Sequence, residues 1–414
     1  MEKVELMAPA GSFESLMAAI KANADSVYFG LDNLNMRRRA ARNFQLKDLA
    51  KVMNICRKNQ VNGYLTLNTI MYDDDLSLMR KICDRAKKAG VNAIIAHDIS
   101  VLGYCKSKNI PVHLSTQANI SNIEAVKFYS QFGDALVLAR ELSLDKIKEI
   151  ANRIKKEEIK GPNGKLIRIE LFAHGALCVS IAGKCHMSLA TYNQPANRGE
   201  CLQNCRRAYK VIDEETGDEL IIDNKYVMSP KDLCTIGFID KLINAGAGIL
   251  KIEGRGRAAD YVYTTTKVYL EAINSFYEGT YSKEKIAEWV KRLETTFNRG
   301  FWHGGYYLGK KLGEWAGVYG SKATKEKIYV GVARNYFAKP KVAHFVIETG
   351  CIKVGDDILI TGPTTGLIES KVSAIHKNEK KATSAKKGDD ITIPITEKVR
   401  KNDKLFVVVD KADF

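Results

Sequence analysis

Five of the nine cysteines lie between residues 178 and 234, and their thiols are the groups best suited to chemistry in this sequence of 414 residues. No two form a C-x-x-C pair, so zinc ribbons, zinc fingers and thioredoxin-type motifs fit poorly. The ferredoxin-type run is absent too, although a [4Fe–4S] cluster needs only four thiolates that converge in space. The spacing favours such a cluster, with structural zinc and buried or redox-active thiols as alternatives. The five are Cys178, Cys185, Cys201, Cys205 and Cys234.

The other features of composition indicate where such a site could operate. The remaining cysteines are isolated in the sequence and are typical of small buried hydrophobic residues. No apolar run approaches the ~18 residues that span a bilayer. The chain enters an apolar strand at Val4 without a signal peptide, so we expect a cytoplasmic protein with no membrane partner.

Short apolar runs alternate with longer amphipathic stretches through the first two thirds of the chain. Leu46–Lys58, for example, has apolar residues at helical spacing. Continuous apolar strands that are each followed by a helix predict a parallel sheet covered on both faces. Eight such units fit a TIM-like (β/α)8 barrel, and an open doubly wound sheet is disfavoured because no G-x-G-x-x-G follows the first strand. The runs are Val4–Met7, Ser26–Gly30, Tyr64–Asn68, Ala93–His97, Val112–Gln117, Ala135–Arg140, Ile169–His174 and Ile249–Glu253.

Polar or charged side chains stand at the carboxyl ends of most of these strands. In a barrel those ends converge on one opening, the mouth, where barrel enzymes keep their catalytic groups. The alternative is that some of these residues only cap helices or fill the top of the barrel. The strand-end residues are Asn68, His97, Asp98, Gln117, Arg140, His174, Glu253 and Arg255.

The cysteines fall in an unusually long segment after the seventh strand. This insertion, residues 176–245, contains an expected hairpin of Tyr209–Asp213 and Glu219–Asp223. Long loops in compact domains are usually functional. Because the segment leaves the carboxyl end of a strand, we expect it to lie over the mouth.

After the barrel, the alternation of strands and helices gives way to strands only. We expect a catalytic barrel domain over residues 1–310, a linker over 311–324 and a small all-β barrel domain over 325–414, where short strands are separated by Gly, Pro and Asp turns. The net charge is +16, which indicates an anionic partner such as RNA. The alternative is that the positive charge only reflects a lysine-rich surface, which is common in proteins encoded by AT-rich genomes.

Several segments resemble the collagenase-like, unclassified peptidase family (peptidase family U32). The resemblance extends to about Gly309, and the cysteine segments are its most specific part. These segments are His174–Cys185, Asn197–Arg206, Ser229–Cys234 and Lys251–Arg255, together with Glu5–Gly11, Tyr28–Gly30, Asn43–Phe44, Ser115–Gln117 and Leu138–Glu141.

The resemblance implies a function other than proteolysis, because several family members look like iron–sulfur hydroxylation factors. One branch forms 5-hydroxyuridine at the tRNA wobble position with prephenate as co-substrate, another hydroxylates a cytidine of 23S rRNA, and a third supports ubiquinone synthesis. A barrel followed by one small β-domain resembles the tRNA branch. The resemblance implies the ligands Cys178, Cys185, Cys201 and Cys234, with Cys205 as the spare.

The same resemblance suggests roles for the residues at the mouth. Prephenate has two carboxylates, which guanidinium groups bind well, so Arg140 and Arg255 are expected to hold it, with Arg257 and Asn68 as further substrate-binding residues. The expected catalytic residues are His174, Glu253 and Gln117.

The tRNA anticodon loop is the expected macromolecular partner, and a paralogous subunit is a further expectation. Arg37–Arg39, Arg206–Arg207 and Lys377–Lys387 are expected to bind phosphates. Stacking of bases is expected from Phe301, Trp302, Tyr306 and Tyr307, although a hydrophobic hinge would explain these aromatic residues equally well.

Two other functions remain open. A peptidase is disfavoured, because the sequence has neither H-E-x-x-H nor G-x-S-x-G and nothing orders His97, His113 and His174 into a triad. A non-catalytic RNA-binding or iron–sulfur partner protein is the third reading.

Overall fold

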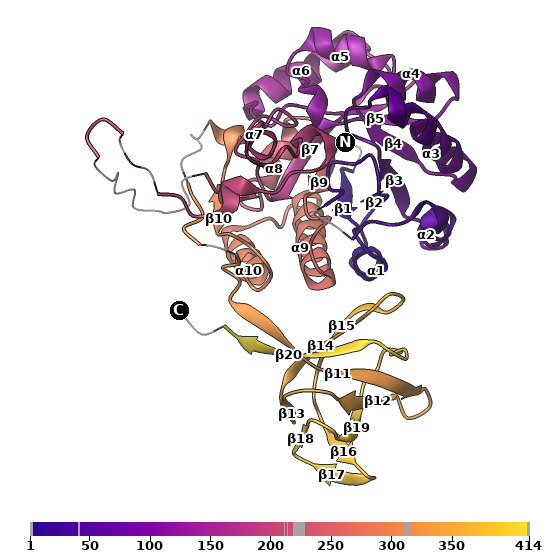
Figure 1. Cartoon of the computed structure of the whole chain (residues 1–414), viewed down its shortest axis with the longest axis vertical. Helices are drawn as coiled ribbons and strands as arrows, with labels where there is room; N and C mark the ends of the chain where they lie inside the picture. Colours follow the sequence, from indigo (N-terminus) through magenta and orange to yellow (C-terminus); the bar gives the residue numbers. More distant parts are fainter. Residues whose placement is uncertain are drawn as a thin grey trace.

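The computed structural model describes residues 3–39, 42–210, 212, 214–217, 228–309, 314–318 and 320–411. Its larger part is a closed barrel of eight parallel strands, in which each of the first seven pairs with the next and β9 pairs with both β7 and β1 (Figure 1). The predicted (β/α)8 barrel is therefore confirmed. The barrel strands are β1 (Glu5–Pro9), β2 (Ser26–Gly30), β3 (Asn62–Thr66), β4 (Ala93–Ala96), β5 (Val112–Leu114), β6 (Ala135–Val137), β7 (Arg168–Gly175) and β9 (Ala247–Ile252).

Helices surround the barrel and cover its outer face. The predicted apolar face of α2 is buried through Leu49, Val52, Met53 and Cys56. No helix within the described ranges is long and apolar enough to cross a bilayer. The helices of the barrel are α1 (Phe13–Lys21), α2 (Leu49–Lys58), α3 (Leu76–Ala89), α4 (Ile99–Ser107), α5 (Ile123–Ser130), α6 (Leu144–Lys156), α8 (Ile239–Asn244), α9 (Ala259–Tyr277) and α10 (Lys283–Glu294).

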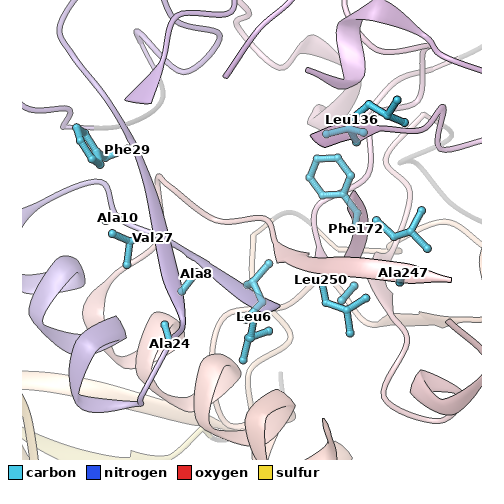
Figure 2. Packing of buried hydrophobic residues seen from close by; sticks show 14 of the residues in the cluster. Leu6, Ala8, Ala10, Ala24, Val27, Phe29, Leu136, Phe172, Ala247 and Leu250 are labelled. Carbon is cyan, nitrogen blue, oxygen red and sulfur yellow. The ribbon is translucent and has the colours of Figure 1, made fainter. Parts of the chain in front are cut away.

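Alternate residues of each strand face opposite sides of the barrel wall. The outward layer belongs to the core beneath the helices and includes Leu6, Val27 and Leu250 (Figure 2). A separate apolar cluster includes Tyr28 and Tyr64 from the alternate positions of β2 and β3. Because inward positions also carry charged residues, the barrel interior contains both an apolar and a polar part.

Two short strands lie beside the barrel, one from the insertion after β7 and one from the chain after α10. β8 (Asp232–Cys234) runs antiparallel to the end of β7, and β10 (Phe301–His303) pairs with β8. The insertion also contains the short helix α7 (Met187–Tyr192). Most of the expected hairpin over residues 209–223 lies outside the described residues.

The C-terminal part is an antiparallel all-β region, as predicted. It has an eight-stranded sheet and a separate pair formed by β13 and β18. The strands are β11 (Lys325–Phe337), β12 (Val342–Ile347), β13 (Cys351–Lys353), β14 (Asp357–Gly362), β15 (Gly366–Lys371), β16 (Ile375–Lys377), β17 (Lys380–Ala382), β18 (Ser384–Lys386), β19 (Asp390–Pro394) and β20 (Lys404–Asp410).

The all-β region is attached to the helices of the barrel, below α1 and α9 in Figure 1. Leu359 and Leu367 belong to the hydrophobic core of the barrel. Lys21 Nζ donates to the carbonyl of Leu367 at 3.0 Å, and Lys327 Nζ pairs with Asp260 at 2.5 Å. This attachment lies on the outside of the barrel and leaves its mouth free of the all-β region.

Gly11, directly after β1, allows the loop after β9 to approach closely. A Cβ atom on Gly11 would lie 1.8 Å from the backbone oxygen of Arg255. We expect Gly11→Ala to lower the free energy of unfolding by about 1–3 kcal/mol, because the loop must move. Gly103→Ala is the matched control, since nothing lies within 4 Å and alanine favours the helix. Equal denaturation midpoints for the two variants would contradict this expectation.

Candidate active site

A cavity of about 180 Å³ lies at the mouth of the barrel, between the strand ends and the insertion. Its charged lining consists of five basic side chains and one carboxylate, so the cavity is suited to anions. Four thiols also reach it. The lining residues used below are Tyr28, Arg37, Thr66, Asn68, Ser115, Gln117, Arg140, Phe172, Cys178, Gly183, Cys185, Cys201, Cys205, Arg206, Lys251, Glu253 and Arg255.

Three cations and two aromatic rings form a continuous arc around part of the cavity. The Phe172 ring has the Arg140 guanidinium carbon at 5.0 Å and Lys251 Nζ at 5.6 Å from its centroid. The Tyr28 ring has Lys251 Nζ at 4.5 Å and the Arg255 guanidinium carbon at 5.9 Å. The rings keep the three positive charges apart while stabilising each of them.

Arg255 is held mainly by neutral partners. Its Nη1 donates to Asn35 Oδ1 at 3.0 Å and to Thr66 Oγ1 at 2.8 Å, and only 4% of the residue is exposed. Burial lowers the pKa of Arg255 to about 10, so its charge persists at neutral pH. A buried cation without a directly bonded carboxylate favours an anionic ligand nearby.

Glu253 is the one carboxylate among the lining residues, and Arg37 pairs with it directly. Tyr28 Oη donates to Glu253 Oε2 at 3.1 Å. Burial alone would raise the pKa of Glu253, but Arg37 and Arg255 outweigh it and lower the pKa to about 2. Glu253 therefore remains ionised at neutral pH, which suits a group that orients Arg37 rather than a proton donor.

Lys251, the second-last residue of β9, lines the cavity and is held in place by a buried carboxylate. Its Nζ donates to Glu170 Oε1 at 2.7 Å, and Glu170 is fully buried. His113 Nδ1 lies 3.6 Å from the other oxygen of Glu170. Burial would raise the pKa of Glu170, but Lys251 and His113 lower it to about 2.

Replacement of Glu170 should strongly destabilise the barrel. Glu170→Gln leaves the Lys251 charge buried without a countercharge, so we expect the free energy of unfolding to fall by about 3–5 kcal/mol at pH 7. In the wild type, ionised Glu170 stabilises the fold at pH values above 4.5, and this stabilisation is lost as the pH falls towards 2. Denaturant titrations at several pH values measure both effects. Glu271→Gln, at a half-exposed pair with Arg292, is the control, with a change below about 1 kcal/mol.

The rest of the rim, from β3 to β5, has neutral polar groups instead of cations. Asn68 Nδ2 donates to Ser115 Oγ at 3.4 Å and to Gln117 Oε1 at 3.3 Å, and Ser115 Oγ also donates to Gln117 Oε1. Asn68 and Gln117 thus lie together at the mouth, where sequence analysis places them.

The four cavity cysteines come from separate turns of the insertion and share one wall. Burial raises the pKa of Cys205 to about 11; Arg206 lowers it, and the nearby Cys178, Cys201 and Cys185 raise it. A thiol whose pKa is raised by neighbouring thiols is suited to a bound cation, which lowers that pKa instead. Among the described residues, however, no three His, Cys, Asp or Glu side chains are already arranged at metal-binding distance. The donor set fits a cluster in chemistry and location.

Cys234 is not part of this wall. It lies in β8, is fully buried, and its Sγ is 3.9 Å from Tyr269 Oη. Burial raises its pKa to about 12. The structure therefore brings Cys178, Cys185 and Cys201 together with Cys205, whereas the resemblance implies Cys234 in its place.

Two other predicted site residues lie away from the cavity. His174 is buried against Tyr269, 3.3 Å from its hydroxyl, and burial lowers the pKa of His174 to about 3. The β7 pairing is irregular between Phe172 and His174, so Phe172 rather than His174 lines the cavity. Arg257 is turned onto the Phe297 ring, 3.5 Å from its centroid.

Some of the predicted RNA-binding residues line the cavity, and the others lie away from it. Arg37 and Arg206 line the cavity, whereas Arg38 pairs with Glu200 and Arg39 donates to Gln194. The prediction that Phe301, Trp302 and Tyr307 stack bases is wrong for this structure, because all three are buried in the barrel core; Tyr306 is partly buried against it.

Sequence analysis missed Lys251, Tyr28 and Phe172 as cavity residues. They lie within strands, and the sequence analysis considered only polar residues at the carboxyl ends of strands. Alternation from Glu253 along β9 would have placed Lys251 on the inward face.

Comparison with known proteins places the chain among relatives with two kinds of names, peptidases and RNA hydroxylation proteins. A family model for peptidase family U32 matches residues 11–317. A protein of Porphyromonas gingivalis named "Collagenase" is 54% identical over 97% of both chains. The "tRNA hydroxylation protein P1" of Bacillus subtilis is 31% identical over 87% of this chain and 84% of its own. A 23S rRNA 5-hydroxycytidine synthase of Escherichia coli is 33% identical over 72% of this chain and 44% of its own.

Proposed function

The chain belongs to peptidase family U32, and from this premise we propose that it is a tRNA-modifying enzyme that forms 5-hydroxyuridine at the wobble position. In this proposal prephenate is the co-substrate and a [4Fe–4S] cluster is the cofactor. Relatives named for tRNA and rRNA hydroxylation support the reaction class.

The observation that carries the proposal is the composition of one cavity at the barrel mouth. It combines four thiols with five basic side chains and a single carboxylate. A cavity of about 180 Å³ is small and suits part of a nucleotide or a small anion rather than a folded protein substrate.

Cys178, Cys185, Cys201 and Cys205 would hold the cluster. When bound, the cluster supplies electron transfer or Lewis acidity, with a potential set by burial and hydrogen bonding. The chain's own residues have separate tasks: Arg206, which donates to the carbonyls of Leu177 at 2.5 Å and Pro230 at 2.8 Å, holds the ends of the insertion together beneath the thiols.

The arc of Arg140, Lys251 and Arg255 would bind the two carboxylates of prephenate. Arg140 is partly buried, its guanidinium lies over the Phe172 ring, and the residue lines the cavity. Guanidinium groups bind carboxylates in a bidentate manner, which orients the ligand as well as binding it.

The RNA would present a splayed base from the anticodon loop. In the insertion, exposed Arg207 lies over Tyr192 with 5.2 Å between its guanidinium carbon and the ring centroid. Tyr192 is 44% exposed, so its ring would offer an aromatic platform for a base.

Mass spectrometry of tRNA nucleosides tests the proposal. A strain lacking this gene and any paralogue should lose 5-hydroxyuridine and its derivatives, and the wild-type gene should restore them. Persistence of these nucleosides in the deletion strain would refute the function.

Peptidase activity is the second candidate, favoured by the relative named "Collagenase". Nδ1 of His97 is buried and has no hydrogen-bond partner among the described residues, whereas Nδ1 of His113 lies 3.6 Å from Glu170. Cleavage of gelatin by pure protein, abolished by Arg140→Gln or Cys201→Ser, would support this candidate instead.

A further inference from the structure

We propose that Gln117 selects uracil over cytosine by presenting an amide N–H group to the carbonyl at position 4 of the target base. This inference rests on the proposed function, because it requires a pyrimidine in the cavity. It assigns Gln117 as a specificity-determining residue and Asn68 as the residue that positions it.

The orientation of the Gln117 amide follows from one backbone group. The backbone N–H of Met36 can only donate, and it donates to Asn68 Oδ1 at 3.2 Å. Asn68 Nδ2 must then be the donor to Gln117 Oε1, at 3.3 Å. Ser115 Oγ donates to the same oxygen. Gln117 Oε1 thus accepts from two donors, and Nε2 has no acceptor among the described residues, so it can donate to a ligand.

Gln117 is also held in place at its stem and backbone. Gly183 of the insertion has a φ of +75°, and a Cβ there would lie 3.1 Å from Gln117 Cγ. Asn119 Nδ2 donates to the Gln117 carbonyl at 2.9 Å and to that of Ala182 at 3.5 Å. The insertion therefore fixes the amide that faces the cavity, and a donor fixed before binding discriminates better than a mobile one.

The chemistry of the two pyrimidines makes such a donor selective. Uracil has a carbonyl acceptor at position 4, and cytosine has an amino donor there. An amide N–H facing an amino group leaves two donors unpaired in a buried site, which is costly. Gln117 and the cations from Arg140 to Arg255 line the same cavity, and Gln117 is the part of this lining that would contact the base.

The test measures the base preference in living cells. A deletion strain is complemented with wild type or a variant and expresses a reporter tRNA with uridine or cytidine at the wobble position. Nucleoside mass spectrometry then gives the ratio of 5-hydroxyuridine to 5-hydroxycytidine at that position. We expect Gln117→Glu, which replaces the donor by an acceptor, to lower this ratio roughly 5- to 150-fold.

Asn68→Asp is the second variant and does not alter Gln117 itself. A carboxylate cannot donate to Gln117 Oε1, so the amide should rotate and turn its oxygen to the cavity; the ratio should fall in the same direction. Gln131→Glu is the matched control, because Gln131 is exposed and donates only to the carbonyl of Phe128 at the end of α5.

The outcomes separate the two proposals. If wild type forms no 5-hydroxyuridine, the proposed function fails. If wild type is active and both Gln117→Glu and Asn68→Asp give the ratio of Gln131→Glu, the assignment of Gln117 is overturned. If Gln117→Glu yields no product from either tRNA, Asn68→Asp decides: a lowered ratio supports the assignment, and an unchanged ratio overturns it.

Discussion

Cys201→Ser is expected to remove both the bound iron and the formation of 5-hydroxyuridine, with the amount of product falling at least about 100-fold. Replacement of residues that only support metal ligands already lowers metal affinity or activity about 10–100-fold, and loss of a ligand itself should cost more. Cys201 belongs to the four-thiol wall, and iron–sulfur clusters are held by cysteine thiolates, which the weakly acidic hydroxyl of serine replaces poorly. Iron analysis of anaerobically purified protein and nucleoside mass spectrometry measure the two losses. Retention of a full complement of iron would contradict the cluster proposal.

A pair of variants decides which cysteine completes the ligand set. Cys205→Ala should lose iron, because Cys205 lies beside Cys178, Cys185 and Cys201. Cys234→Ala should keep iron, because Cys234 is buried beside Tyr269 in β8. The opposite result would restore the ligand set implied by the family resemblance and would require β8 to rearrange around the cluster.

Arg140→Gln should weaken the binding of prephenate, the proposed dianionic co-substrate, by about 10- to 150-fold. This is the effect expected for the loss of hydrogen bonds to a charged group. Arg140 makes no ion pair within the described chain and lies over Phe172 at the cavity. The expected result is a higher concentration of prephenate for half-maximal 5-hydroxyuridine formation, with the folded barrel intact.

Arg257→Gln is the matched control for this change. Arg257 lies only two residues from Arg255, but its guanidinium stacks on Phe297 outside the cavity. Its replacement should leave the prephenate dependence unchanged. An equal shift in both variants would mean that the net charge of the mouth, rather than Arg140 itself, attracts the dianion.

The barrel could be predicted from sequence because each strand carries a continuous apolar run. Buried parallel strands require such runs on both faces, and the helices between them repeat apolar residues at helical spacing. The strand-end rule also found Asn68, Gln117, Arg140, Glu253 and Arg255, since strand ends in a barrel must meet at one opening.

Some predicted site residues lie away from the cavity because a local irregularity changes the direction of the side chain. His174 follows an irregular step in β7 and faces Tyr269, and Arg257 follows a turn in which its N–H donates to the Gly254 carbonyl. Cys234 lies in β8, which pairs beside the barrel instead of over its mouth. Neither a single-residue shift nor an added antiparallel strand leaves a pattern in the sequence.

Closure of the barrel by β9 also sets an order of events during synthesis. β1 pairs with β9 at Glu5 and Ile249, positions 244 residues apart, and all the insertion cysteines precede Ile249. At ~5–20 residues per second, a ribosome needs roughly 12–49 s between these two positions. The thiols therefore leave the ribosome while the sheet is still open, before the last strand can close the barrel around them.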